Sequence, residues 1–233
     1  MATLVVLTFN LSSMKKFFCS IFLLIFLSNC VFTKNISLSS DEFNNVHGKT
    51  IAVVSREKSD MTLKTPFHAA FIGGLLVSFS MVYQGNKIVK ENDIDDPSFL
   101  VAKKLQSDLA KSHNLKIANS LVSEKVDTYN VSKISDLYRG IADYVVDVRT
   151  LNWGLSYVSA DISNYAIIYS SQMKLIDVKN SKVIAENACT FTPYKKYQKD
   201  VMLADKAIIL KQEFIGAADA CAKLFKEIAF NLK

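Results

Sequence analysis

The sequence is poor in the residues that build catalytic and metal centres. It has 233 residues but only three histidines, His47, His68 and His113, and none of them is spaced as a ligand with the cysteines. A structural zinc site needs four cysteine or histidine ligands in short, paired spacings. A nucleophile elbow, a phosphate-binding loop and a His-Glu-x-x-His motif are also absent. The sequence therefore predicts no metal site, no cofactor and no catalytic residues, so we expect a protein that is not an enzyme.

Charge of either sign is not concentrated in any stretch of the chain. There are 28 basic and 22 acidic residues, which give a net charge of +6, and the lysines are scattered. Nucleic-acid binding needs basic residues clustered on one face, so we expect no nucleic-acid partner. Four aspartates near the expected strands lack a partner for acid–base chemistry, and we interpret them as strand-edge or turn carboxylates: Asp143, Asp147, Asp161 and Asp177.

The first thirty residues have the layout of a bacterial lipoprotein signal peptide. Met14 is followed by two lysines, then by an uncharged apolar run over 17–27, and the segment closes on Cys30. A basic start followed by a short apolar run is typical of export signals. We therefore expect residues 1–29 to be removed as a signal peptide, with Met14 as the biological start, and Cys30 to carry the lipid.

The residues around this cysteine leave other interpretations open. Leu27 and Ser28 fit the lipobox pattern, whereas Asn29 is larger than the Gly, Ala or Ser that normally precedes the cysteine. The alternatives are a plain secretory signal, which leaves Cys30 an ordinary thiol, and a membrane anchor, for which the apolar run is short of the roughly 20 residues needed. Val31, rather than Asp, after the cysteine predicts an outer-membrane lipoprotein that faces the periplasm. Its lipid anchor then makes the membrane a partner.

The remaining cysteines form an even pair. Cys19 falls within the signal and Cys30 is the expected lipid site, which leaves Cys189 and Cys221. In an oxidising compartment such a pair favours a disulfide. The alternative is two buried thiols, because cysteine packs as a small apolar residue.

The rest of the chain predicts a linker and one domain. Residues 30–48 are rich in Asn and Ser, which is typical of a flexible tether, and residues 49–233 are long enough for a single domain with its own core. Asp96, followed by Pro97, is the expected N-cap of a helix. Apolar periodicity predicts strands at 49–55, 116–122, 143–150, 165–178 and 183–192, and helices at 97–113, 130–142 and 200–231. This order predicts an α+β fold with a single mixed or antiparallel sheet, helices mainly on one face and a long C-terminal helix.

One segment differs from the rest because it has no charged side chain between Thr65 and Asn86. Thr65 as N-cap, Pro66 at the first helical position and Gly85 just after the end bracket an apolar helix over 66–84. Part of the segment also alternates as a membrane β-hairpin does, so a pair of strands is the competing interpretation.

Small residues recur every four positions in this segment, at Ala70, Gly74 and Ser78. This spacing lets helices approach each other closely. These three residues are therefore the predicted contact with a membrane or with a second copy in a homo-oligomer. The alternative is that the helix packs only on its own domain.

The second half of the chain resembles a known group of proteins. A short helix leads into the strand at 143–150, the hairpin Leu-Ile-Asp-Val-Lys-Asn-Ser-Lys-Val-Ile-Ala-Glu follows over 175–186, and a helix ends the chain. This order resembles uncharacterised bacterial envelope lipoproteins. More distantly, it resembles the domain shared by the curli-secretion channel lipoprotein, the lipoprotein activator of penicillin-binding proteins and the N-terminal domain of the Tol translocation protein. The likeness spans about residues 49–230.

This resemblance implies a noncatalytic domain that binds or assembles with other envelope components. The leading expectation is therefore a lipid-anchored envelope protein whose partner is an unidentified envelope protein. The alternative is an oligomeric pore or export-accessory lipoprotein that uses the apolar segment 66–84.

Overall fold

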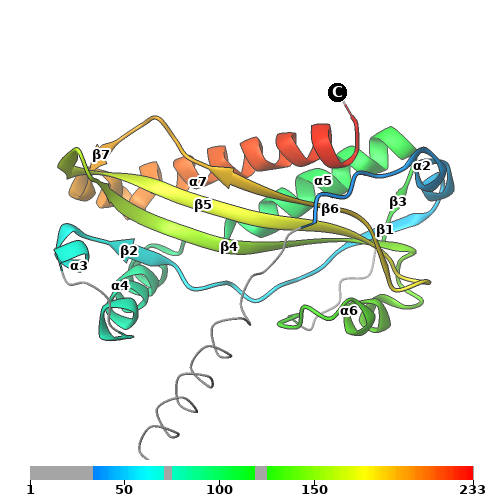
Figure 1. The fold of residues 1–233 in the computed structure, drawn as a ribbon, viewed down its shortest axis with the longest axis horizontal. Helices are drawn as coiled ribbons and strands as arrows, with labels where there is room; N and C mark the ends of the chain where they lie inside the picture. The colour runs from blue at the N-terminus through cyan, green and yellow to red at the C-terminus, as the bar shows by residue number, and fades with distance from the viewer. Residues whose placement is uncertain (1–33, 71–74, 119–124, 233) are drawn as a thin grey trace, which may run out of the picture. The chain divides into compact units, whose positions relative to one another are not determined.

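The computed structural model describes residues 34–70, 75–118 and 125–232. In this part of the chain seven strands form one mixed sheet (Figure 1). The strands are β1 (Thr50–Val53), β2 (Thr62–Lys64), β3 (Lys116–Ile117), β4 (Tyr144–Val158), β5 (Asp161–Asp177), β6 (Lys182–Phe191) and β7 (Tyr197–Gln198). The helices are α2 (Ser40–Val46), α3 (Pro66–Ala70), α4 (Leu75–Asn92), α5 (Pro97–His113), α6 (Val131–Tyr138) and α7 (Lys199–Ala229).

The long antiparallel pair β4–β5 forms the centre of the sheet. Strands β1 and β2 both run parallel to β4 along its other edge, and β3 continues the sheet beyond β1. On the far edge of β5, β6 and β7 pair antiparallel. A turn joins β5 to β6, where the Asp177 carboxylate accepts hydrogen bonds from the backbone and side-chain amides of Asn180. The α+β class, the single mixed sheet and the hairpin predicted over 175–186 are confirmed.

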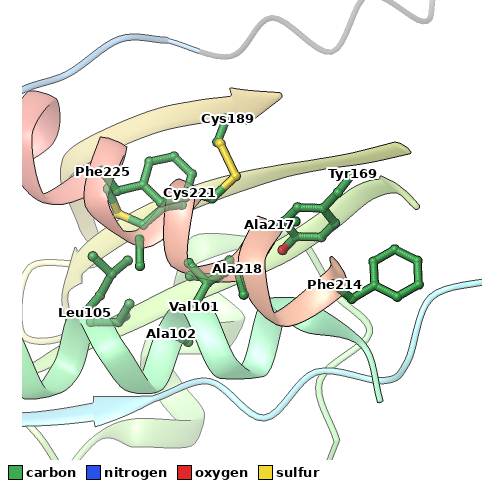
Figure 2. Close-up of a cluster of buried hydrophobic side chains, with 14 of the residues drawn as sticks. Val101, Ala102, Leu105, Tyr169, Cys189, Phe214, Ala217, Ala218, Cys221 and Phe225 are labelled. Carbon is green, nitrogen blue, oxygen red and sulfur yellow. A yellow bond between two sulfur atoms is a disulfide. The ribbon is translucent and has the colours of Figure 1, made fainter. Parts of the chain in front are cut away.

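The main core lies where α5 and α7 cover one face of the sheet (Figure 1). Figure 2 shows Val101 and Ala102 of α5 on the side that meets Ala217 and Ala218 of α7. All four side chains are buried, and their small size lets the two helices lie close together. The apolar faces of these helices therefore explain why they share one side of the sheet.

The predicted disulfide is present. Cys189 of β6 and Cys221 of α7 are joined (Figure 2), and both are buried. The bond fixes the C-terminal helix to the last long strand, across a sequence separation of 32 residues.

A smaller core lies on the other face of the sheet, under α6. Ile134 and Tyr138 of this helix pack with Ala52, Val145 and Ile176, which alternate along their strands with residues of the main core. The Tyr138 hydroxyl donates a hydrogen bond to the Val53 carbonyl. The helices of the described residues thus lie mainly, but not all, on one face.

The C-terminal helix is long, as expected, but it is broken near its start. Ala204 is extended, and Asp205, Lys206 and Ala207 have positive φ values of 50°, 57° and 55°. The first turn of α7 is therefore set off from the longer helix that packs on the sheet.

The prediction of an apolar helix over 66–84 with Gly85 just after its end is wrong, because α3 covers Pro66–Ala70 and α4 runs from Leu75 to Asn92, past Gly85 and into a charged stretch. Gly85 lies inside this helix, where a Cβ atom would stand 2.0 Å from the Met61 carbonyl oxygen. The absence of a side chain at Gly85 lets the helix approach the Met61 backbone closely. It does not mark the end of the helix. Residues 71–74, between α3 and α4, lie outside the described part, and no helix within the described ranges is long and apolar enough to cross a membrane.

The flexible tether predicted over 30–48 does not hold from Ile36 onward. Ile36 exchanges two backbone hydrogen bonds with Glu186, and the Leu38 amide donates to the Ala229 carbonyl. Helix α2 follows with a capping box between Ser39 and Glu42. Because Leu38 is buried in the main core, this segment is part of the domain.

Candidate functional site

A recess lies beside the start of α5. This hollow has a volume of about 690 Å³. Its walls come from the loop after β1 (54–58), the loop between α4 and α5 (93–96), the first turns of α5 and the middle of α7, with Lys125 and Val148 completing it. Segments that are far apart in the sequence thus meet at one place.

The floor of the hollow is apolar and firmly held. Phe214 of α7 lies against Trp153, with ring centroids 5.3 Å apart. The Trp153 indole Nε1 donates a hydrogen bond of 3.0 Å to the Ser59 carbonyl, which fixes the loop after β1. Trp153 is fully buried, so this floor is a rigid part of the core rather than a mobile lid.

Asp96 joins three segments at the edge of the hollow. As predicted, it is the N-cap of α5, and its carboxylate accepts from the Ser98 amide at 2.9 Å. The same carboxylate accepts from the Ser59 hydroxyl at 2.8 Å and from the Thr150 hydroxyl. Since these donors occupy both of its oxygens, we assign Asp96 a structural role in holding the start of α5.

Two of the cations that line the hollow, Arg56 and Lys58, bind carboxylates and carbonyls of the protein. Arg56 donates two hydrogen bonds of 2.6 Å to Asp147, one to each carboxylate oxygen. It also donates to the Thr128 carbonyl at 3.1 Å. Lys58 donates to the Ile94 carbonyl at 2.7 Å and lies 3.3 Å from Asp95. These contacts tie the surrounding loops together.

Three other lysines line the hollow and are not bound in this way. Among the described residues Lys103, Lys125 and Lys211 make no ion pair, and all three border the recess. The Lys103 ammonium lies 5.5 Å from the centre of the Phe99 ring. Glu57 and Asp93 also border the recess and make no ion pair among the described residues. The recess therefore suits a ligand that carries apolar groups and charge, whose negative groups can meet the three lysines.

A polar network crosses strands β4, β5 and β6. Arg149 of β4 donates to Gln172 of β5 at 2.6 Å, and Gln172 donates to Glu186 of β6 at 2.6 Å. The exposed ring of Tyr129 lies 4.3 Å from the Arg149 guanidinium and 5.3 Å from that of Arg56. Sequence reasoning missed this cluster because its members come from five separate segments with no local motif.

The four aspartates considered as candidate acids or bases all serve the structure. Asp147 is 4% exposed and paired with Arg56. Asp143 is buried in part, which raises its pKa, but bonds from the Thr50 amide and hydroxyl outweigh this effect and lower the pKa overall. Asp161 accepts from Asn164, and Asp177 holds the β5–β6 turn.

The predicted membrane or oligomer contact residues lie on or between α3 and α4. Ala70 ends α3 and Ser78 lies exposed on α4, while Gly74 lies outside the described residues. The predicted lipid site, Cys30, also lies outside them. Within the described ranges no cluster of His, Cys, Asp or Glu has the arrangement of a metal site.

Comparison with known proteins finds likeness only among solved structures. No protein-family model and no curated protein matches the sequence. The LpoB C-terminal domain from Salmonella enterica shares 11% identity over 64% of this chain and 85% of that one, with a TM-score of 0.28. The PelC dodecamer from Paraburkholderia phytofirmans shares 13% identity over 85% of this chain and 96% of that one, with a TM-score of 0.36.

A third solved structure has the word lipoprotein in its name. Lipoprotein GNA1162 from Neisseria meningitidis shares 12% identity over 75% of this chain and 98% of that one, with a TM-score of 0.28. Lipoproteins are thus among the proteins to which this chain has a distant structural likeness.

Proposed function

We propose that the protein is a lipid-anchored, noncatalytic component of the bacterial cell envelope that binds another envelope component through the hollow. The observation that carries this proposal is the combination of a buried apolar floor with lysines that make no ion pair among the described residues. The recess therefore has the make-up of a binding site.

Export to an oxidising compartment is supported by the disulfide. The Cys189–Cys221 bond lies in the core, and such structural disulfides persist in the periplasm rather than the cytosol. In the proposal, residues 1–29 are the signal peptide, with Met14 as its start, and Cys30 carries the lipid. The protein then sits on the outer membrane and faces the periplasm. Because Ile36 already bonds to β6, only the residues between Cys30 and Ile36 separate the proposed lipid from the domain.

The partner that fits the hollow is a segment of an envelope protein with apolar and acidic side chains. Apolar groups would replace water over Phe214 and Ile215, and carboxylates would pair with Lys103, Lys125 and Lys211. Pairing at the rim would contribute more to the association rate and to specificity than to affinity.

A site-specific crosslink tests this proposal. A photoreactive amino acid replaces Ile215, which lines the hollow and is half exposed, and cells are irradiated intact. The matched control places the same group at Tyr194, which is fully exposed outside the hollow. We expect a discrete crosslinked product from position 215 alone, and we expect Lys211→Glu to reduce its yield several-fold. Equal products from both positions, or no effect of Lys211→Glu, would argue against the hollow as the binding site.

A further inference from the structure

Helix α4 presents large apolar side chains to the outside. Leu76 is 82% exposed, Phe79 61% and Tyr83 72%. Their spacing of three and then four residues places them on one side of the helix. We call this set, Leu76, Phe79 and Tyr83, the α4 face. Exposed apolar groups gathered on one surface mark a contact with another molecule or with a membrane.

The opposite side of α4 holds the helix in place. Gly85 lies against the Met61 backbone, and Ile88 is buried in the main core. The Asn86 side chain accepts a hydrogen bond of 3.0 Å from the Met61 amide. The α4 face is therefore kept outward by contacts along β2 and does not result from a loosely packed helix.

Charge along the helix changes from one end to the other. No charged residue occurs between Thr65 and Asn86, whereas the later part of α4 carries Lys87 and Lys90. Lys87 follows Tyr83 by one helical turn, so it extends the same side, and it lies 3.8 Å from Glu91. Apolar and aromatic groups followed by lysine on one side of a helix suit the boundary between acyl chains and lipid headgroups.

The proposed anchor keeps the domain close to a bilayer. Ile36 is fixed to β6, and the chain from Cys30 to Ile36 spans at most about 20 Å when fully extended. This short tether gives the membrane a high effective concentration at the domain surface. A partner protein would have to be recruited to the domain, whereas the proposed anchor keeps the bilayer within the length of the tether from Ile36.

We propose that the α4 face rests on the membrane to which Cys30 is anchored. Leu76, Phe79 and Tyr83 lie at the level where acyl chains meet headgroups, and Lys87 lies among the phosphates. The helix lies along the surface and does not span it. This inference rests on the proposed lipid anchoring, but it assigns a second contact made by different residues.

The test measures lipid contact at a single labelled position. The only cysteines of the mature chain are Cys30 and the disulfide pair, so Phe79→Cys introduces one free thiol in the lipidated protein. An environment-sensitive dye is attached there, and the protein is reconstituted in vesicles of phosphatidylethanolamine and phosphatidylglycerol with brominated acyl chains. Tyr194→Cys, at a fully exposed position, is the matched control.

We expect brominated lipid to quench the dye at position 79 at least threefold more than the dye at position 194. Equal quenching at both positions would overturn the proposal. A blue-shifted dye at position 79 without lipid quenching would also overturn it and would assign the face to a second copy or to another protein. Mass spectrometry of Cys30 separates the two proposals, because an unmodified cysteine contradicts the anchor on which this inference rests, whereas a lipidated Cys30 with equal quenching contradicts the α4 contact alone.

Discussion

At the scale of single residues, the space around Gly85 decides what this position tolerates. A glycine inside a helix normally costs about 1 kcal/mol relative to alanine. Here a Cβ atom would stand 2.0 Å from the Met61 carbonyl oxygen. Gly154 of β4 approaches the same strand from the other side, where a Cβ atom would stand 2.0 Å from the Thr62 carbonyl oxygen. Strand β2 therefore lies between two backbone segments that come so close to it that only glycine fits at positions 85 and 154.

We expect Gly85→Ala to lower the free energy of unfolding by about 1–3 kcal/mol, because overpacking outweighs the gain in helix propensity. Gly216→Ala in α7 is the matched control. Nothing lies within 4 Å of a Cβ atom there, so it should raise the free energy of unfolding by about 0.5–1 kcal/mol. Urea denaturation measures both. A stabilising Gly85→Ala would contradict the close approach to Met61.

The Arg56–Asp147 ion pair is the second feature at which a single substitution should strongly lower the free energy of unfolding. Its side chains are 8% and 4% exposed. We expect Asp147→Ala to lower the free energy of unfolding by about 3–5 kcal/mol, since it leaves a buried guanidinium without its partner.

An exposed ion pair provides the comparison for Asp147→Ala. Arg139 and Asp136 lie 2.9 Å apart and are 58% and 66% exposed, so Asp136→Ala should cost less than about 1 kcal/mol. Thermal or urea unfolding of both variants checks the difference. Similar losses for the two variants would mean that burial adds nothing to the Arg56–Asp147 pair.

At the scale of elements, α2 is held to the sheet by a titratable contact. Lys182 at the start of β6 donates a 2.7 Å hydrogen bond to Glu42. This bond is the main cause that lowers the pKa of Glu42 below its usual 4.5. The unfolded segment therefore binds a proton more readily than the folded one does. The stabilising contribution is complete above pH 4.5 and is lost as the pH falls through the lower, folded pKa.

We expect the segment around α2 to open more often as the pH is lowered below about 4.5. Hydrogen-exchange protection of the Ile36 and Leu38 amides, which bond to Glu186 and Ala229, measures this opening. In Glu42→Gln their protection should be lower at neutral pH and change less with pH. The Val145 amide in the central strand serves as the internal reference. An unchanged pH profile in Glu42→Gln would exclude Glu42 as the titrating group.

At the scale of the whole molecule, the expected arrangement is a domain held to the membrane at two places. The first contact is the lipid on Cys30, and the second is the α4 face. The hollow would then face a partner in the periplasm. Each of these contacts uses residues that the other two do not use, so each can be removed by itself.

The lipid is the most direct of these contacts to test. We expect labelled palmitate to enter the wild-type protein and to be absent from Cys30→Ser, because the Cys30 sulfur is the predicted attachment atom. Cys19→Ser, in the predicted signal, is the control and should label as the wild type does. Gel autoradiography of the immunoprecipitated protein is the measurement. Equal labelling of Cys30→Ser would contradict the lipoprotein proposal.

Much of the fold could be predicted because it depends on neighbours in the sequence. Asp96 and Pro97 marked the start of α5, and Asn180 marked the turn of the hairpin. The disulfide followed from the cysteine count once the signal and the lipid site were set aside. Local patterns of this kind specify elements and turns, and in this chain they also specified the single α+β domain.

The candidate site could not be predicted in the same way. Its floor, its rim lysines and the Arg149–Gln172–Glu186 network bring together residues that no spacing rule connects. Ser78 was expected at a contact because of its small size, whereas the structure exposes the large side chains of Leu76 and Phe79 beside it. Periodicity alone does not say which side of a helix the rest of the domain covers.

By itself, the sequence determined the order of the long strands and of helices α5, α6 and α7, the N-cap of α5, the hairpin and the pairing of Cys189 with Cys221, but not α2, β2 or β7. Each depends on residue types at short spacing or on a simple count. Only the tertiary structure decided that Gly85 lies inside a helix, that the domain begins at Ile36 and that distant segments enclose the hollow. The physical reason is that close backbone approach, burial and buried ion pairing arise between residues that meet only when the chain folds.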